Sequence, residues 1–360
     1  MKIVLISLTD APSLRKHAVH LAEELMDSHQ VHLFGNHLYK KNQEQDNYML
    51  YNFCKTKRPL IEIRTFDLLN LFRIIKRINE INPDIIHFTS THHPWHNVIA
   101  MLFKKKIKII YSIHDPITQP GEKVTKIQQA NVNLIINRLS DHLVVFGKGH
   151  KNMLEQKKVY NVSNIRLGEF KQHATKPYEI NPEGFVLLYG RIRRYKGIPY
   201  FIKTAEYVYK RNKNIKFVLA GSGDISKYYN GPLDLPNLVI MNRFIEDDEI
   251  RDLIINSKVV LLPYTFASQS GVIPEVYSYG RPVITTDVGC LSEMVEHGVT
   301  GYLVQPEDYI SMGERILEIY RNDEKLNNLA DASLSKYSRE YTPKQMAKEL
   351  MHIYTNVLGS

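Results

Sequence analysis

The sequence predicts an α/β protein made of two doubly wound, Rossmann-like domains, each a parallel sheet with helices on both faces. Short apolar runs alternate with segments of helical periodicity along most of the chain, which is the pattern of such sheets. A length of 360 residues exceeds what one hydrophobic core usually organises, so two domains are expected. A composition that is 43% hydrophobic and 24% charged indicates a globular chain and argues against disorder.

The first half supplies the elements of one domain. Ser13 is the candidate cap of the first helix, and the tyrosine- and asparagine-rich stretch 39–58 is expected to be irregular and exposed. The expected strands are 2–8, 31–34, 61–64, 85–88, 107–113 and 142–146, and the expected helices are 13–26, 68–80, 94–103 and 121–139.

The alternation restarts after a linker-like segment, 177–184. Helices are expected at 197–211, at 247–255 and between Ser270 and Gly280, where glycine closes the helix. The expected strands are 185–189, 216–220, 238–241, 259–262, 282–286 and 302–304. We therefore predict an N-terminal domain over 1–176 and a C-terminal domain over 177–342, with a last helix at about 343–358 packed back on the first domain. Because ligands lie at the carboxyl ends of parallel strands, the two domains should face each other across a cleft.

Positive charge is concentrated in the first half. Residues 1–175 carry 25 Lys and Arg against 15 Asp and Glu, whereas 176–360 carry 22 against 23. This asymmetry fits an anionic membrane or a phosphate-bearing acceptor that meets the first domain, and it fits nucleic acid less well. The residues concerned are either a membrane-facing patch or solvated helix edges; they are Arg73, Lys76, Arg77, Lys104, Lys105, Lys106 and Lys108.

The sequence also bears on the compartment. Cys54 and Cys290 are far apart and lack metal-binding spacing, which suits a reducing compartment. The first ten residues are expected to form a strand rather than a signal peptide, and no apolar run approaches the roughly 18 residues of a membrane-spanning helix. We expect a cytoplasmic protein, peripheral at the inner face of the plasma membrane.

Residues 268–284, SQSGVIPEVYSYGRPVI, predict a loop, a short helix and a buried strand. The first amides of this helix lack intrahelical partners and lie at the positive end of the helix dipole; they belong to Ser270, Gly271, Val272 and Ile273. This is either a phosphate site or an ordinary helix start. Glu275, one turn into the helix, either accepts hydrogen bonds from sugar hydroxyls or is solvated.

Two cations follow the first strand of the second domain, where a ligand is expected. Arg191 and Lys196 in GRIRRYKG could hold a diphosphate without a metal, together with the helix start. The alternative is a solvated basic loop. Gly221, in the turn AGSGD, is weaker evidence for a ligand because turns need glycine for backbone reasons.

These motifs resemble those of glycosyltransferase family 4, the group 1 glycosyltransferases, which are retaining enzymes of the GT-B fold that use nucleotide sugars. The resemblance covers most of 185–305 and is weaker before it. It is carried in the second half by GRIRRYKG, AGSGD, NRFIEDDEI, SGVIPEVYSYGRPVITTDVG and SEMVEHGVTGYLV, and in the first half by MKIVLIS, DIIHFTS, IIYSIHDP and DHLVVF.

The resemblance implies the residues that contact the donor, a UDP- or GDP-sugar used without a cofactor. Arg191 and Lys196 would hold the diphosphate, and Glu275 would bind the ribose hydroxyls. His114 would reach the transferred sugar from the first domain. The backbone beside the base would be that of Arg243, Phe244 and Ile245.

The sequence departs from the family pattern at two places. The family's paired-glutamate motif would place its first Glu at position 267, which is Ala267 here. That carboxylate usually contacts the donor sugar, and Ser268 or Gln269 are the candidates to replace it. The first loop, 9–13, lacks the glycine pair often found there, so it either admits phosphate less closely or faces the acceptor.

Metal binding is the less favoured interpretation of two further clusters. His87, His92, His93 and His96 surround one strand end without an accompanying cysteine or carboxylate pattern. The acidic run 246–249 resembles a metal motif, but it precedes a helix, where acids stabilise the dipole. We therefore predict no metal site.

We predict a retaining glycosyltransferase that moves a sugar to a hydroxyl acceptor, a lipid-linked saccharide of bacterial surface polysaccharide assembly. No carboxylate is evidently placed as a nucleophile, which favours direct front-face transfer. The alternative from another class is a catalytically silent GT-B subunit that binds nucleotide or a partner transferase, suggested by Ala267. A nucleic-acid-binding protein is the third reading, and it lacks any motif beyond charge.

Overall fold

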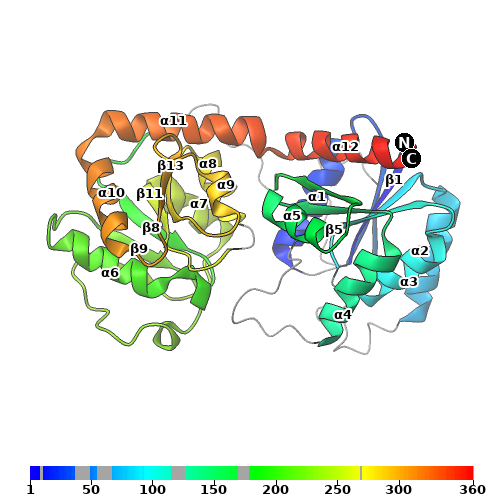
Figure 1. Cartoon of the computed structure of the whole chain (residues 1–360), viewed down its shortest axis with the longest axis horizontal. Coiled ribbons are helices and arrows are strands. Elements are labelled where there is room, and N and C mark those ends of the chain that lie inside the picture. Colours follow the sequence, from blue (N-terminus) through cyan, green and yellow to red (C-terminus); the bar gives the residue numbers. More distant parts are fainter. Residues whose placement is uncertain are drawn as a thin grey trace. The chain divides into compact units, whose positions relative to one another are not determined.

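The structure is a computed structural model that describes residues 1–8, 11–36, 49–54, 67–91, 93–114, 126–168, 178–267 and 270–359. These residues form two compact units (Figure 1). Unit 1 contains the described residues up to 168 and the C-terminal segment from 341, and unit 2 contains 178–340. The predicted strand 61–64 and the start of the predicted helix 121–139 lie outside the described residues.

Unit 1 is built on a parallel sheet whose described strands run in the order β3-β2-β1-β4-β5-β6-β7. The strand order reverses between β1 and β4, because later strands add on the other side of β1. The strands are β1 (Lys2–Ser7), β2 (Gln30–Asn36), β3 (Met49–Cys54), β4 (Ile85–Phe88), β5 (Lys108–Ile113), β6 (His142–Phe146) and β7 (Val162–Ile165).

Helices cover both faces of this sheet, and each face has its own apolar core. One core joins Leu21 of α1 (Pro12–Leu25) to Leu350 of α12 (Pro343–Gly359). The other joins Ile74 of α2 (Leu68–Ile81) to Ile99 of α3 (Pro94–Phe103). The remaining helices are α4 (Lys126–Leu134), continued by a π-helix (Ile135–Leu139), and α5 (Lys148–Gln156).

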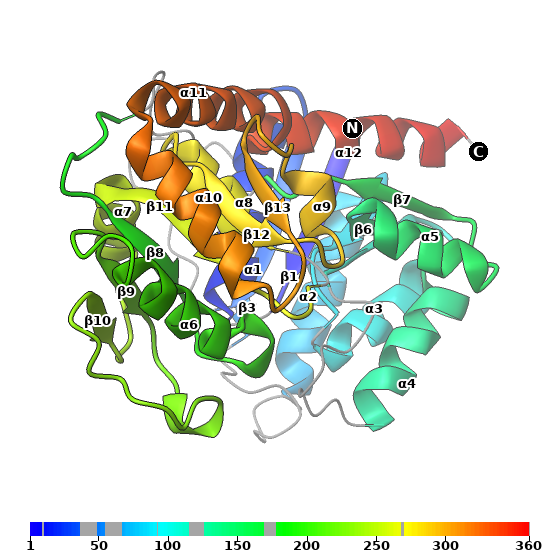
Figure 2. The ribbon, with the colours of Figure 1, turned by 60° about the vertical axis from the view of Figure 1, so that its left-hand side comes forward.

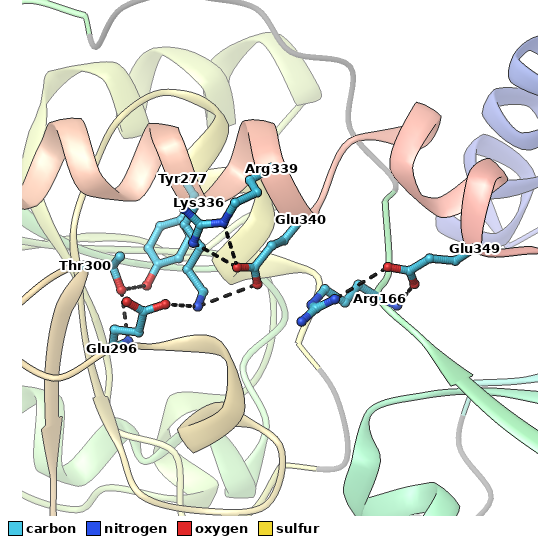
Figure 3. Close-up of polar contacts among 8 residues, drawn as sticks. All are labelled: Arg166, Tyr277, Glu296, Thr300, Lys336, Arg339, Glu340 and Glu349. Carbon is cyan, nitrogen blue, oxygen red and sulfur yellow. Dashed lines mark hydrogen bonds and ion pairs between the residues drawn. The ribbon is translucent and has the colours of Figure 1, made fainter.

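The C-terminal helix α12 is part of unit 1. Its Tyr354 is buried, and the phenol oxygen lies 2.5 Å from Nδ1 of His87 on β4. Its Glu349 accepts a hydrogen bond from the backbone amide of Arg166 at 3.1 Å, and their side chains form an ion pair at 3.5 Å (Figure 3). The chain therefore begins in unit 1, forms unit 2, and returns to unit 1 with its last helix.

The structure corrects two expectations about unit 1. Residues 49–54 form β3 rather than an irregular segment, because they pair in parallel with β2 from His32↔Met49 onward; the rest of the stretch 39–58 lies outside the described residues. Ser13 does not cap α1, which begins one residue earlier at Pro12, with Ala11 as a cap that makes no side-chain bond. Proline suits the first helical position because its φ is already helical and its missing amide hydrogen is not needed.

Unit 2 is a second parallel sheet, with its described strands in the order β10-β9-β8-β11-β12-β13. Its order reverses between β8 and β11, so the carboxyl ends of these two strands mark the position at which such sheets bind ligands. The strands are β8 (Phe185–Tyr189), β9 (Phe217–Ala220), β10 (Leu238–Met241), β11 (Ser257–Leu262), β12 (Val283–Thr286) and β13 (Gly301–Val304).

The helices of unit 2 follow the predicted order. Gly280, with a φ of +65°, ends the short helix that the sequence predicts between Ser270 and Gly280. The helices are α6 (Ile198–Tyr209), α7 (Asp247–Asn256), α8 (Val272–Ser278), α9 (Leu291–Met294), α10 (Tyr309–Arg321) and α11 (Asp323–Glu340), with 3-10 turns at Arg194–Lys196 and Ile225–Lys227. No helix of the described ranges is long and apolar enough to cross a membrane.

A polar network fastens α11 across α8, which lie side by side in both views of the ribbon (Figures 1 and 2). Tyr277 of α8 donates to Thr300 at 2.8 Å, and the same Thr300 oxygen accepts from the amide of Glu296. The carboxylate of Glu296 pairs at 2.5 Å with buried Lys336 of α11, which also lies 3.6 Å from Glu340 (Figure 3). The network fixes the helix that carries Glu275 against the last helix of its unit.

Arg281 is the largest fully buried side chain of the described residues, and it anchors the segment that enters unit 2. Its guanidinium donates to the carbonyls of Tyr178 (2.8 Å), Glu179 (3.0 Å) and Ile255 (2.7 Å), and also to that of Gly280. Burial lowers the pKa of this guanidinium to about 10, which leaves it charged at neutral pH. It therefore joins the strand start after α8 to the chain entry at 178–179.

We expect Arg281→Met to lower the free energy of unfolding by about 3 kcal/mol, because several buried carbonyls would lose their donor. Urea denaturation monitored by circular dichroism measures the loss. Arg251→Met on α7 is the matched control, since Arg251 forms only exposed ion pairs with Asp248 and Asp252 and should cost less than ~1 kcal/mol. Equal losses for the two variants would contradict the anchoring role.

Candidate functional site

Lys196 is buried at the carboxyl end of β8, where the chain reverses through the 3-10 turn Arg194–Lys196. Its ammonium donates to the carbonyl oxygen of Tyr189 at 2.9 Å and lies 5.4 Å from the ring centroid of Tyr264. Burial lowers the pKa of this amine to about 8; the nearby charge of Arg191 lowers it further, and that of Glu275 opposes the shift. A buried cation is thus held at the strand-order reversal of unit 2.

Glu275 of α8 faces the same strand end. Its carboxylate accepts a hydrogen bond of 2.6 Å from the phenol of Tyr189, the last residue of β8. Burial raises the pKa of the Tyr189 phenol well above its ordinary value, and the charge of Glu275 raises it further, so the phenol stays protonated as a donor. Tyr189 therefore binds Lys196 through its carbonyl and Glu275 through its side chain.

Helix α8 begins at Val272, three residues before Glu275. Gly271 is the cap residue, and its carbonyl accepts the amide of Glu275 at 3.3 Å, the first bond of the helix. Val272 and Ile273 form the first turn, whose amides have no acceptor within the helix. The Ser270 side chain is buried, and its hydroxyl oxygen has no hydrogen-bond partner among the described residues. Ser268 and Gln269 lie outside those residues.

The loop that follows β11 is held closely in place. Thr265 donates its amide to the carbonyl of Tyr195 at 2.8 Å, which joins this loop to the turn carrying Lys196. Thr286 of β12 donates to the carbonyl of Tyr264 at 2.5 Å. Ala267 is buried, and a Cβ on Gly289 would lie 1.7 Å from its carbonyl oxygen. The position where the family pattern has a glutamate is therefore a buried alanine packed against glycine.

Gly221 has a packing role. Its φ is +155°, and a Cβ there would lie 2.0 Å from the carbonyl oxygen of Gly190. The amide of Gly190 donates to Ala220, and that of Ile192 donates to Ser222, each at 2.9 Å. The glycine-rich turn after β9 thus lets the loop after β8, which contains Arg191, approach at backbone distance. The close approach of the two loops is therefore a backbone reason for glycine at position 221.

The segment after β10 contains the residues expected beside the base. Arg243 is exposed and binds both carboxylate oxygens of Glu249, with its Nη1 at 2.8 Å from Oε2. Phe244 is highly exposed, whereas Ile245 is buried. Glu249 belongs with Asp247 and Asp248 to the first turn of α7, so this acidic run stabilises the helix start, as its position in the sequence predicts.

His114 follows β5 in unit 1, at the carboxyl edge of that sheet. Its Nε2 lies 3.2 Å from the carbonyl oxygen of Thr89, and its ring stacks on Phe146 with centroids 4.5 Å apart. His17 of α1 approaches edge-on at 5.1 Å between centroids. His17 is fully buried without hydrogen-bond partners for its ring nitrogens among the described residues; burial, followed by the charge of His114, lowers its pKa. A neutral imidazole therefore supports the His114 ring.

The other histidines of this region make local contacts. His87 binds Tyr354 and Ser112, and burial lowers its pKa to about 3. His93 accepts the amide of Trp95 at the start of α3, and His96 contacts the carbonyl of Ser90 at 2.9 Å; His92 lies outside the described residues. Within those residues, no group of three His, Cys, Asp or Glu side chains is arranged to hold a metal ion.

Sequence reasoning missed several residues that complete these sites. Tyr189 and Tyr264 end or follow strands of unit 2, and their roles depend on contacts with residues up to 86 positions away. His17 and Phe146 likewise meet His114 only through the fold. The one sequence signal for Tyr189 was its position at the end of the expected strand 185–189, immediately before a glycine.

Two family models match most of the chain, one in each half. The model described as Glycosyltransferase Family 4 matches residues 14–167, and the model described as Glycosyl transferases group 1 matches residues 183–322. The chain belongs to the group 1 glycosyltransferases of family 4. This confirms the resemblance inferred from the motifs and extends it over the first half, where those motifs were weaker.

Curated members of the family are distant relatives. Alpha-D-kanosaminyltransferase of Streptomyces kanamyceticus is 24% identical over 68% of this chain, and the match spans 65% of its own length. N-acetyl-alpha-D-glucosaminyl L-malate synthase of Bacillus anthracis is 22% identical over 98% of this chain and 97% of its own. The capsular polysaccharide glycosyltransferase CapM of Staphylococcus aureus is 22% identical over 60% of this chain and 56% of its own.

Solved structures of similar proteins show the fold. The Anabaena protein HepE, in complex with UDP, is 17% identical with a TM-score of 0.73 over 99% of this chain and 100% of its own. Sucrose-phosphate synthase of Thermosynechococcus elongatus is 16% identical with the same TM-score over 100% and 99%. The two-domain α/β fold predicted from the sequence, GT-B, is confirmed.

Proposed function

We propose that this glycosyltransferase moves a sugar from a nucleotide-diphosphate donor, a UDP- or GDP-sugar, to a hydroxyl acceptor with retention of anomeric configuration. The observation that carries the proposal is the buried Lys196 ammonium at the strand-order reversal of unit 2, held by Tyr189 beside Glu275. A buried cation with a carbonyl and an aromatic ring as its contacts can be balanced by an anionic ligand. HepE, a protein of the same fold, was solved with UDP.

The proposed donor contacts all involve residues of unit 2. Lys196 and the exposed Arg191 bind the diphosphate oxygens, with the first amides of α8, at 270–273, as further donors. Glu275, oriented by Tyr189, accepts the ribose hydroxyls. The backbone of 243–245 flanks the base, and Ser268 or Gln269 takes over contacts with the sugar from the missing glutamate. Gly221 contributes by letting the Arg191 loop approach its neighbour.

The chemistry needs stabilisation of the negative charge that grows on the leaving diphosphate while the sugar becomes cationic. Preorganised donors such as Lys196 provide it, each such group being worth roughly 3 kcal/mol in the transition state. Because position 267 offers no carboxylate, the acceptor oxygen bonds to the anomeric carbon on the face from which the phosphate leaves. The departing phosphate oxygen takes the acceptor proton. A trapped covalent glycosyl-enzyme would contradict this route.

His114 contacts the transferred sugar from unit 1. Its ring is held on two sides, by the Thr89 carbonyl at Nε2 and by stacking on Phe146. His17 excludes water from a third side, since it is fully buried against the ring. A side chain fixed in this way can orient a hydroxyl with little loss of conformational entropy.

The acceptor is a saccharide carried on a lipid at an anionic membrane, on the cytoplasmic side. Charge supports this, because the Lys and Arg surplus lies wholly in the first half of the chain. Family relatives named for capsular polysaccharide biosynthesis and for O-antigen mannosyl transfer point to similar acceptors. The proposal includes no metal, no cofactor and no nucleic-acid partner.

A catalytically silent nucleotide-binding subunit is the second candidate, and the buried Ala267 favours it. Release of nucleotide from a sugar nucleotide in the presence of an acceptor separates the two candidates. The silent subunit would bind the sugar nucleotide, but it would not raise the rate of nucleotide release above the rate measured without protein.

We expect Lys196→Met and Arg191→Ala each to reduce nucleotide release by ~100-fold or more, because each removes a cation that stabilises the leaving diphosphate. Glu275→Gln should chiefly raise KM for the donor, since its contact is with the ribose. Release of UDP or GDP in a coupled assay measures both effects. Lys213→Gln, at an exposed site of unit 2, is the matched control and should leave the rate unchanged. Activity retained by Lys196→Met would contradict the site assignment.

Donor binding should weaken above about pH 8. Lys196 binds the diphosphate as an ammonium, and burial lowers its pKa to about 8, so the cation is present below that pH and lost above it. The dissociation constant for the donor nucleotide should then rise by about tenfold per pH unit. Calorimetric titrations between pH 6.5 and 9.5 measure this. Lys196→Arg, which stays charged, should make the dissociation constant less dependent on pH. An unchanged pH dependence in that variant would mean that a group other than Lys196 causes it.

A further inference from the structure

The outward faces of α2 and α3 in unit 1 form a surface that is both apolar and basic. We propose that this surface, defined by Leu68, Leu69, Phe72, Val98, Met101 and Leu102 with the cations that border it, docks unit 1 on an anionic lipid bilayer. The inference rests on the proposed lipid-carried acceptor, and it identifies the part of unit 1 that contacts the membrane.

Helix α2 is apolar on two opposite sides. Its inner side is Leu71, Ile74, Ile78 and Ile81, all buried in the sheet core. On its outer side Leu68, Leu69 and Phe72 are 71%, 73% and 66% exposed, and all three rank among the most exposed large hydrophobic side chains of the described residues. Phe72 follows Leu68 by four residues and Leu69 by three, the two spacings that make side chains neighbours on a helix surface. A helix bathed only in water would carry polar residues there.

Helix α3 repeats the arrangement. Trp95, Ile99 and Phe103 are buried against the sheet, whereas Val98, Met101 and Leu102 are exposed at spacings i, i+3 and i+4. Both helices belong to the same apolar core, and they lie side by side in both ribbon views (Figures 1 and 2). Their exposed side chains therefore lie on the same outer side of unit 1.

Cations border this surface. On α2 the exposed Arg73 and Lys76 follow Phe72 within one turn. Beyond Leu102, Lys104, Lys105 and Lys106 are exposed, and Lys104 donates to the carbonyl of Arg138. Residues 94–108 contain no Asp or Glu. Apolar side chains bordered by lysine and arginine match a bilayer with anionic headgroups, because the former enter the acyl region while the latter meet phosphates.

The position of the surface suits a lipid-borne acceptor. Helix α3 begins six residues after β4 ends, and α2 ends four residues before β4 begins, so both helices start near the carboxyl edge of the sheet. The α2 residues Leu68, Leu69 and Phe72 therefore lie toward the edge that carries His114, whereas Met101 and Leu102 lie toward the other end of α3. In unit 2 the exposed large apolar residues, such as Val239 and Val299, are scattered over separate elements. Contiguous exposed apolar side chains, unlike scattered ones, indicate an interaction site.

Co-sedimentation of the full chain with vesicles tests the proposal. We expect binding to phosphatidylcholine vesicles that contain phosphatidylglycerol, weaker binding to phosphatidylcholine alone, and partial release by salt. The double variants Leu69→Ser/Phe72→Ser and Lys105→Gln/Lys106→Gln should each lower the vesicle partition coefficient about tenfold or more. Val239→Ser and Lys213→Gln, exposed on unit 2, are the matched controls and should bind as the unmodified chain does.

The proposal is overturned if the chain does not bind, if it binds both vesicle types equally, or if the double variants bind like the controls. It is also overturned if the surface proves to join two copies of the chain, seen as a dimer in gel filtration that Leu69→Ser/Phe72→Ser makes monomeric. Nucleotide release with a water-soluble acceptor separates the two claims. Release without vesicle binding refutes the docking surface alone, and vesicle binding without release refutes the proposed function alone.

Discussion

The contact on which unit 2 depends is that between a buried ammonium and the end of one strand. Lys196 is held by the Tyr189 carbonyl and lies over the Tyr264 ring, while the phenol of Tyr189 binds Glu275 on α8. Burying a cation costs free energy unless it is compensated, and the lowered pKa of Lys196 reflects that cost. An anionic ligand between this cation and the helix start, such as the proposed donor diphosphate, would relieve that cost.

The surrounding backbone keeps this arrangement in place. The loops after β8 and β9 approach so closely that only glycine fits at 221, and the loop after β11 is bonded to the turn of Lys196 through Thr265. Behind α8, Tyr277 connects through Thr300 and Glu296 to Lys336 of α11. Glu275 thus stands on a helix fixed at both faces, which is what preorganised binding of a charged ligand requires.

Much of this could be predicted from the sequence because its signals are local. Apolar runs predicted most of the strands, and glycine and acidic residues predicted boundaries of α8 and α7. The strand β3 was missed because its order depends on pairing with β2, and Ser13 was misplaced because Pro12 begins the helix. Lys196 was predicted, but its partners Tyr189 and Tyr264 were not, since only the fold brings them together. Likewise, the sequence alone does not distinguish the exposed apolar side chains of α2 from its buried ones.

A thermal-shift panel tests the central claim most directly. UDP-, GDP- and ADP-sugars are compared with the matching nucleoside diphosphates, monophosphates and nucleosides, because a ligand that binds only the native state raises the melting temperature. We expect one base series to stabilise the protein, with the diphosphate and its sugar effective and the nucleoside without effect, and we expect Lys196→Met to abolish the shift. No shift with any diphosphate, or an equal shift with the nucleoside, would show that the Lys196 site does not bind a donor diphosphate.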